Sequence, residues 1–213
     1  MGLKLFMEDN MAYLPDSTIR SLCFKKVLDG NNKWKSVPCE NALIKPFIER
    51  TVINGCSGGL SSHGYDITIA EDVVLKPGDF LLASSIEYFQ MPNNLVGTVH
   101  DKSTMVRQGL HVHNTVIEAG WYGFLTLELK NQHPWWKRLF QFVGMYKKCT
   151  LHIKRGSPIA QVMFALTVTP CEQPYSGKYQ NQAAGPQQAR KEIGNVPVGN
   201  HTQEYPSVWE DFL

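Results

Sequence analysis

The sequence predicts a mainly β protein, and two observations carry this prediction. Apolar residues alternate with polar ones over short runs, first at Tyr65, Ile67 and Ile69, and this alternation is typical of half-buried strands. Turn signals separate the runs at close intervals, as at Leu75–Asp79 and Pro92–Asn94. Short strands with frequent turns indicate a sandwich or a barrel.

The chain before these strands predicts one short helix and two irregular stretches. Residues Leu14–Leu28 form a helix in this prediction, because Pro15–Ser17 offers a cap and apolar residues follow at helical spacing. A turn follows at Asp29–Lys33, and Ile44–Arg50 is extended because it contains a proline. The Gly/Ser-rich stretch Gly55–Gly64 lacks the Lys-Ser/Thr ending of a P-loop, so it is interpreted as a plain loop.

The remaining strands follow the same rhythm. They are predicted at Phe80–Ala83, Ile86–Phe89, Leu95–Val99, Phe124–Leu129, Cys149–Ile153 and Ile159–Val168. The composition then changes: residues 171–213 are rich in Gln, Gly, Asn and Pro. We therefore expect a β domain over residues 1–170, with the short helix at its start, and a tail over 171–213. Within the tail, Tyr175–Gln182 carries several hydrogen-bonding groups and is expected to close over a ligand.

Composition excludes several classes of protein. A chain of 213 residues can bury one sizeable core. A formal net charge of only +2 argues against a protein that coats nucleic acid. No stretch is long and apolar enough to span a membrane. The five cysteines are widely spaced without a C-x-x-C, which indicates reduced thiols in a cytoplasmic protein rather than a disulfide framework or structural zinc.

The stretch His133–Phe142 combines two Trp and two Phe with two basic residues. An apolar flap or a subunit contact explains this composition best. Stacking on single-stranded nucleic acid is the alternative.

Two neighbouring stretches carry the candidate site. Lys102, Ser103, Thr104 and Arg107 lie within six residues, and ammonium, hydroxyl and guanidinium groups suit an anionic ligand such as a phosphate chain. Each alone is also typical of an ordinary surface or turn residue. Glu128 stands between leucines in a predicted strand, so its carboxylate is either paired or catalytic.

Metal chemistry has little support in the sequence. His111 and His113 alternate along a strand, but no cysteines complete a ligand set, so a structural role is favoured. Zinc-dependent nucleobase deaminases need H-x-E and P-C-x-x-C, and neither motif occurs. Any deamination by this chain would have to activate water without zinc.

Eight blocks, in order along the chain, resemble the dCTP deaminase branch of the dUTPase-like superfamily. They are Ile44–Arg50, Ser61–Asp66, Phe80–Phe89, Lys102–Arg107, Trp121–Gly123, Thr126–Leu129, Ile159–Gln161 and Gly177–Gln180. The resemblance implies a distorted β-barrel or jelly roll with a few short helices. It also implies a homotrimer whose active sites lie between subunits, and a deoxycytidine triphosphate ligand carrying Mg²⁺ on its phosphates, with no metal held directly by the protein.

The resemblance also assigns roles to residues. Lys102, Ser103, Thr104 and Arg107 would hold the phosphates; Asn114 and Thr115 would lie beside the base, and Glu118 near the deoxyribose; Thr126 and Glu128 would face the pyrimidine; Trp121, Gln161, Tyr175, Lys178, Tyr179 and Gln182 would complete the nucleotide pocket. Glu128 would act as the general base, with Ser103 and Arg107 as catalytic partners. Ser103 and a backbone carbonyl near residues 113–115 would orient the water.

Alternatives to dCTP deamination stay open. Acidic residues occupy both Glu118 and Glu128, so a dUTP diphosphatase or a bifunctional enzyme that forms dUMP is the second reading. A deaminase of dCMP or of a modified cytosine nucleotide is a further alternative. A catalytically silent nucleotide sensor is the last. The sequence departs from the family pattern at His100–Asp101, where a glycine is usual, between Tyr175 and Lys178, and in the long stretch from Asn131 to Gly156.

Overall fold

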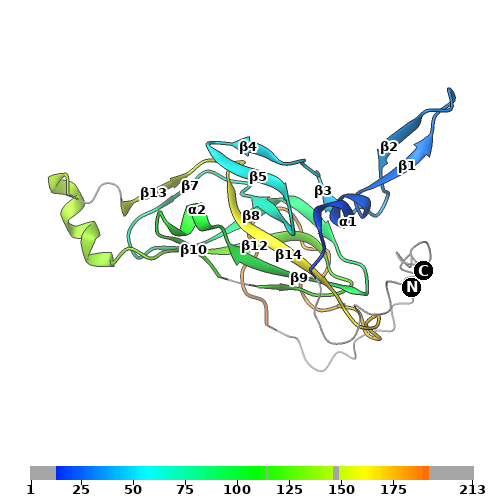
Figure 1. Ribbon diagram of the computed structural model, residues 1–213. Helices are drawn as coiled ribbons and strands as arrows, with labels where there is room; N and C mark the ends of the chain where they lie inside the picture. Colours follow the sequence, from blue (N-terminus) through cyan, green and yellow to red (C-terminus); the bar gives the residue numbers. More distant parts are fainter. Residues whose placement is uncertain (1–12, 114, 146–148, 192–213) are drawn as a thin grey trace.

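The computed structural model describes residues 13–113, 115–145 and 149–191 (Figure 1). Their elements are α1 Asp16–Ser21, β1 Phe24–Leu28, β2 Trp34–Pro38, β3 Ile44–Lys45, β4 Thr51–Ile53, β5 Cys56–Ser61, β6 Gly64–Thr68, β7 Val73–Leu75, β8 Phe80–Gln90, β9 Leu95–Asp101, α2 Ser103–Val106, β10 Leu110–Val112, β11 Val116–Ile117, β12 Tyr122–Asn131, the 3₁₀ helix η2 Trp135–Val143, β13 Leu151–Ile153 and β14 Pro158–Leu166. The predicted fold class, mainly β with a few short helices, is confirmed.

Two antiparallel sheets form the body of the molecule. One has the strand order β11-β9-β14-β6-β5-β4 and the other β10-β12-β8-β3. Their facing surfaces enclose the core, where Phe89 of β8 packs against Phe164 of β14 with ring centroids 6.5 Å apart. Burying a large apolar side chain of this kind contributes roughly 1.5–3 kcal/mol, so the facing surfaces hold the sheets together.

The strand β12 shows how the sequence positions the site. Its side chains alternate strictly, and the buried set includes Leu125, Leu127 and Leu129. Thr126 and Glu128 therefore point to the opposite side of the sheet, away from the core. The alternation predicted for Phe124–Leu129 from the sequence gives this side of the sheet its polar floor.

The predicted helix over Leu14–Leu28 is wrong in its second half. The helix α1 ends at Ser21, and Phe24–Leu28 is a strand that pairs with Trp34–Pro38. The carboxylate of Asp29 closes the turn between them, because its Oδ1 accepts the backbone N–H groups of Asn31 and Lys33, both at 2.9 Å. The turn chemistry outweighs the helical spacing, and the hairpin projects from the body (Figure 1).

The prediction that Gly55–Gly64 is a plain loop is also wrong. The stretch contains β5 and the start of β6, which pair with each other. Gly59 has φ +77°, and a Cβ there would lie 2.5 Å from the carbonyl oxygen of Ile48. Glycine is therefore required because the irregular segment around Ile48 passes close to the backbone of β5, not by loop flexibility.

The two strands predicted at Phe80–Ala83 and Ile86–Phe89 are one strand, β8. Ser84 and Ser85 interrupt the apolar pattern, yet both are buried. The Ser85 hydroxyl donates to the Glu87 carbonyl at 2.7 Å and accepts the Leu125 N–H at 2.8 Å, at the irregularity in the pairing of β12 with β8. Hydrogen bonds satisfy these hydroxyls, so the strand continues through them.

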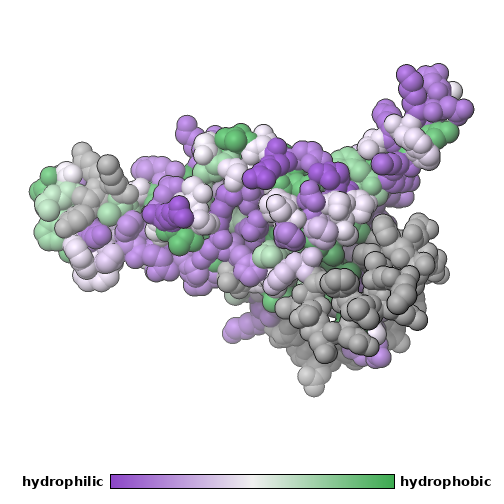
Figure 2. Space-filling view, in the orientation of Figure 1, coloured by the Kyte–Doolittle hydropathy of each residue, from purple (hydrophilic) through white to green (hydrophobic). Residues whose placement is uncertain are grey.

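The aromatic and basic stretch forms η2, an arm at the far end of the molecule from the β1–β2 hairpin (Figure 1). Trp135, Leu139 and Phe140 are exposed on it. Figure 2 shows apolar surface at this arm and a mostly hydrophilic tip on the hairpin. No helix within the ranges given above has both the length and the apolar character needed to cross a bilayer.

Candidate active site

A cavity of about 590 Å³ lies over the outward side of β8 and β12. Residues that belong to three parts of the chain line it: Phe80, Leu82, Leu125, Thr126 and Glu128 from the sheet; Thr115, Val116, Ile117, Glu118 and Trp121 from the segment before β12; and Tyr175, Tyr179, Gln182, Gln187, Gln188 and Ala189 from the C-terminal segment. The register places Glu128 opposite Leu82, so the carboxyl rises from an apolar floor.

The Glu128 carboxyl is the chemically distinctive group of this cavity. Its Oε2 is buried and, within the described part of the chain, has no hydrogen-bond partner. Burial raises the pKa of the Glu128 carboxyl above its usual value of 4.5, while a backbone hydrogen bond and the nearby His113 act in the opposite direction. A half-buried carboxyl with a raised pKa holds a proton more strongly than an exposed one, so it can accept a proton from water and return it.

The hydroxyl of Thr126 ties the C-terminal segment to the floor. Its Oγ1 accepts the Gln182 side-chain Nε2–H at 2.8 Å and the Gln187 backbone N–H at 3.0 Å. Gly123 allows the close approach, since its φ is +147° and a Cβ there would lie 2.6 Å from the Gln182 nitrogen. The glycine of the Trp121–Gly123 block thus seats the segment over β12.

Trp121 and the tyrosines build the wall of the cavity. The Trp121 indole N–H donates to the Tyr179 carbonyl at 2.7 Å, and the Tyr175 N–H donates to the Ala119 carbonyl at 2.8 Å. The Tyr179 N–H reaches the Tyr175 hydroxyl oxygen at 3.1 Å. Lys178 is exposed and lies over the Tyr179 ring, with its Nζ 5.4 Å from the centroid. Three predicted pocket residues therefore come together here, and Lys178 lies on their outer side.

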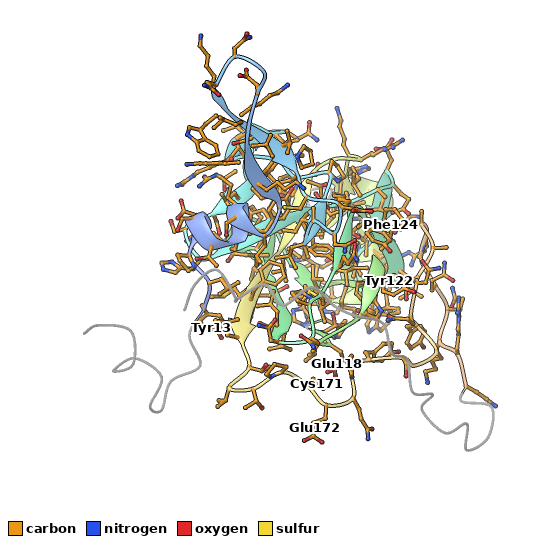
Figure 3. All side chains as sticks on the ribbon, turned by 90° about the vertical axis from the view of Figure 1, so that its right-hand side faces the viewer. Tyr13, Glu118, Tyr122, Phe124, Cys171 and Glu172 are labelled. Atoms are coloured by element: carbon orange, nitrogen blue, oxygen red, sulfur yellow. The ribbon has the colours of Figure 1, made fainter. Side chains whose placement is uncertain are left out.

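The residues expected beside the base and the sugar are placed unequally. Glu118 is exposed at the cavity, near the end of the molecule that also carries Cys171 and Glu172 in Figure 3. Thr115 is half-buried in the cavity lining. Asn114 lies outside the described residues.

The expected phosphate-binding residues are not brought to this cavity within one chain. Ser103, Thr104 and Arg107 are exposed on or directly after α2, and none of them lines the cavity. Lys102 is buried: its Nζ lies 2.8 Å from Asp66 Oδ2 and donates to Ser57 Oγ at 3.2 Å. This ammonium is already engaged by a buried carboxylate, a contact that the sequence spacing could not reveal.

Gln161 is also separate from the cavity lining. Its Nε2 donates to the Ser61 hydroxyl at 2.9 Å, between β14 and the end of β5. This contact joins two of the blocks on which the family resemblance rests, and within the described structure it fastens β14 to the β5–β6 turn.

Asp101, which departs from the pattern of the resemblance, directs its side chain to the strand β10. Its Oδ2 lies 2.7 Å from His111 Nδ1, and its Oδ1 accepts the Val112 N–H at 2.7 Å. The described residues contain no group of three or more His, Cys, Asp or Glu side chains arranged to hold a metal ion. The two histidines of the sequence pattern are therefore part of a local pair, not of a metal cluster in that part of the chain.

The sequence reasoning missed three residues of the lining that hold or shape the floor. Phe80 and Leu82 belong to a predicted strand, but their side was not assigned, because the two serines obscured the register of β8. Gln187 lies in the tail, where no periodicity marks it, and its backbone N–H contact with Thr126 depends on tertiary structure.

Comparison with known proteins decides the family. The family model described as dCTP deaminase-like matches residues 61–139. The dCTP deaminase of Acidobacterium capsulatum is 30% identical over 185 residues, which cover 71% of this chain and 93% of that protein. The chain belongs to the dCTP deaminase family. The dCTP deaminase of Campylobacter fetus subsp. fetus is similar to it at 31% identity, over 71% of this chain and 92% of the relative.

The chain also resembles solved dUTPase structures. The dUTPase of Staphylococcus bacteriophage 80alpha aligns with a TM-score of 0.45 and 22% identity, covering 63% of this chain and 93% of that one. The native EIAV dUTPase aligns with a TM-score of 0.40 and 21% identity, covering 54% and 84%.

Proposed function

We propose that this member of the dCTP deaminase family converts dCTP and water to dUTP and ammonia, without zinc, as a step toward dTTP precursors. The observation that carries the proposal is the position of Glu128. Its carboxyl stands on the floor of a cavity large enough for a nucleoside, with Oε2 buried and unpartnered among the described residues. Membership of the family supports the choice of cytosine deoxynucleotide as substrate.

The chemistry needs a single carboxylate. Ionised Glu128 takes a proton from a water molecule, whose oxygen forms a bond to C4 of the cytosine. Glu128 returns that proton to N3, which leaves a tetrahedral C4 carrying a hydroxyl and the amino group. The hydroxyl proton passes through Glu128 to the amino nitrogen, the C4–N bond breaks, and ammonia leaves uracil behind. Thr126, beside Glu128 on the same side of β12, would orient the ring.

The closing segment supports this chemistry by excluding water. Residues 171–190 contact β12 through Gln182 and the wall through Tyr175 and Tyr179. We propose that the β domain ends near residue 170 and that the following tail closes the active site. A closed site protects the attacking water from bulk solvent and strengthens charge interactions with the substrate.

A second copy of the chain is needed for the triphosphate. Ser103, Thr104 and Arg107 are exposed and do not line their own chain's cavity. We propose a homotrimer in which these residues serve the cavity of a neighbouring subunit, with Ser103 also orienting the water and Arg107 balancing phosphate charge. Lys102 would reach phosphate only by leaving Asp66, so its first role is to anchor the start of α2.

Magnesium enters with the nucleotide in this proposal. The described donor set gives no cluster for a protein-held ion, and Asp66, the buried carboxylate beside the phosphate-binding segment, is paired with Lys102. Mg²⁺ would therefore be held by phosphate oxygens, where it neutralises their charge. We also propose a cytoplasmic location, since all five cysteines are free and dCTP is an intracellular metabolite.

The shared site can be tested by mixing two inactive variants. Glu128→Gln and Arg107→Ala damage residues that the proposal places on different subunits. Random mixing makes about three trimers in four mixed, and each mixed trimer holds one intact site, so roughly a quarter of the wild-type ammonia release should return. Glu128→Gln mixed with Glu128→Ala, two changes of the same side chain, serves as the control, because no arrangement of these subunits rebuilds an intact site. Equal recovery in both mixtures, or none in either, would reject the shared site.

The reaction itself is tested by identifying products from dCTP, dCMP and dUTP by mass. We expect dUTP from dCTP, with turnover that survives a zinc chelator. Rapid dUMP formation from dUTP would instead make the chain a diphosphatase, or a bifunctional enzyme if dCTP also yields dUMP. Nucleotide binding by calorimetry without any product would identify a sensor.

A further inference from the structure

Three side chains that the proposed reaction does not use stand in a row beside Glu128. Asp101 ends β9, His111 lies in the edge strand β10, and His113 follows that strand. Because His111 and His113 are two residues apart in extended chain, both face the cavity side of the sheet. The register places His111 opposite Lys130, and the His113 N–H donates to the Glu128 carbonyl at 2.9 Å.

The Asp101 carboxylate fixes the first member of this row. One oxygen lies 2.7 Å from His111 Nδ1 and the other accepts the Val112 N–H, also at 2.7 Å. The Asp101 and His111 side chains are 27% and 32% exposed, so water reaches the pair only in part. A carboxylate in this position holds the imidazole ring in one orientation through its Nδ1.

The His111 ring in turn fixes His113. The two ring centroids are 4.8 Å apart with an interplanar angle of 72°, an edge-to-face contact. Phe80 contacts His113 at a centroid distance of 5.9 Å, and Phe80 also lines the cavity. His113 is exposed to solvent, yet its ring is held between two neighbours, so its orientation depends on His111 and, through it, on Asp101.

The charge of His113 acts on the catalytic carboxyl. Among the described residues, the titratable and charged groups around Glu128 are His113, Lys130 on its own strand, Glu118 before β12, and Tyr175 and Tyr179 in the closing segment. Lys130 turns its ammonium to the Gly78 carbonyl at 2.7 Å. His113 is the side chain whose charge opposes the effect of burial on Glu128.

We propose that Asp101 and His111 are positioning residues for the deamination: they hold the His113 imidazole in its place next to Glu128. The inference rests on the proposed function for its catalytic meaning. Its physical content, a link from Asp101 through two imidazoles to Glu128, holds for the free protein as well.

The direction in which Asp101→Asn shifts the pKa of Glu128 separates this link from a direct effect of the Asp101 charge. The negative charge of Asp101, acting on Glu128 through space, would raise the pKa of Glu128, so Asp101→Asn would lower it. Acting through the histidines, Asp101 has the opposite influence, because its loss releases the His113 ring from its place next to Glu128, where His113 lowers the pKa of that carboxyl. We therefore expect Asp101→Asn to raise the pKa of Glu128 by about half a pH unit.

The measurement is an NMR titration of the free protein labelled with ¹³C at the glutamate carboxyl, with the Glu128 signal assigned from Glu128→Gln. Asp101→Asn and His111→Gln should both move the Glu128 midpoint to higher pH. Asp101→Asn made in a His113→Phe background should move it no further. Asp72→Asn is the matched control, since the Asp72 carboxylate also accepts a backbone N–H, from Arg155 at 2.6 Å, beside a different sheet. It should leave the midpoint unchanged.

A midpoint that stays in place or moves to lower pH in Asp101→Asn would overturn the inference. In the enzyme assay, the same variants should move the acid limb of kcat/KM upward by the same amount while KM at the plateau changes little. Wild-type protein that titrates as expected but releases no ammonia from dCTP would reject the proposed function and leave the link standing. Wild-type protein that deaminates dCTP, combined with no midpoint shift in Asp101→Asn, would reject the link and leave the proposed function standing.

Discussion

Glu87 and Glu128 lie on neighbouring strands and show two fates of a carboxyl removed from water. Glu87 of β8 is fully buried, and its two oxygens accept the backbone N–H and the hydroxyl of Thr68 at 3.0 and 2.7 Å. Glu128 of β12 points the other way, into the cavity, with Oε2 unpartnered in the described structure. Burial raises the pKa of both.

The difference lies in what each carboxyl can still do. Glu87 has partners for both oxygens inside the core, so its proton affinity affects stability alone. Glu128 has an oxygen available to a water molecule and a substrate. A raised pKa is therefore no mark of catalysis by itself, and the free oxygen at a cavity is what distinguishes the two.

The largest expected effect separates the two carboxyls by activity. Glu128→Gln should lower kcat for ammonia release from dCTP by about 10²–10⁴-fold, because the proton acceptor is lost while the shape of the side chain is kept. Calorimetry should still show nucleotide binding. Glu87→Gln, the same change on the adjacent strand, should keep activity near the wild-type level. Comparable losses of activity in both variants would remove the distinction.

Glu87 should reveal itself in stability instead. Burial raises the pKa of Glu87 from 4.5 to about 7. Between these values the folded protein keeps a proton that the unfolded chain has released, so stability falls as pH rises through this window. The full loss above pH 7 is about 3 kcal/mol per chain.

Urea unfolding of wild type and Glu87→Gln between pH 4.5 and 8, at one protein concentration, measures this loss. The variant should lack the decline and gain on the wild type as pH increases. Parallel stability curves would show that Glu87 ionises in the folded state as easily as in the unfolded chain.

The pH dependence of the reaction sharpens the account of Glu128. The base must be ionised, so kcat/KM should fall as pH drops through the pKa of Glu128. Burial raises that pKa, which places the midpoint above 4.5. Initial rates from pH 4.5 to 9 with dCTP and Mg²⁺ locate it. An acid limb with a midpoint at or below 4.5 would contradict the burial of the working carboxyl.

The smallest expected effect concerns the floor beside Glu128. Thr126→Val removes the acceptor of Gln182 and Gln187, and an unmatched buried donor costs about 1–3 kcal/mol. We expect a roughly tenfold rise in KM for dCTP. We also expect faster proteolytic cleavage of the closing segment, at bonds beyond residue 174. Thr167→Val, which removes a hydroxyl that donates to the Thr169 carbonyl just after β14, is the control. An unchanged KM with an unchanged cleavage rate would show that the segment is seated without Thr126.

The strict alternation around Glu128 made β12 predictable, including which side its carboxyl takes. The β1–β2 hairpin was not predictable in this way, because its apolar residues also fit a helix and the turn at Asp29 decides between them. The buried serines of β8 concealed its continuity, since hydrogen bonds formed only after folding satisfy them.

The candidate site also has a part that the sequence could predict and a part that it could not. The residues of β12 near Glu128 could be grouped from the sequence, because they follow one another along a single strand. The engagement of Lys102 by Asp66 could not, because the two residues are far apart in the chain and meet only through sheet pairing. The Asp101–His111 pair was hidden for a different reason: only ten residues separate the two, but they meet because the chain turns through α2 and brings β10 back to the end of β9. From the sequence, Asp101 stood out only as a departure from the family pattern.

The most direct test of the central claim uses enzyme treated with a zinc chelator and then given dCTP and Mg²⁺ in H₂¹⁸O. We predict dUTP with one ¹⁸O at C4 of the base, an intact triphosphate and one ammonia per turnover, all dependent on Glu128. Label on the α-phosphate of a monophosphate product, or no labelled uracil until zinc is restored, would contradict the account.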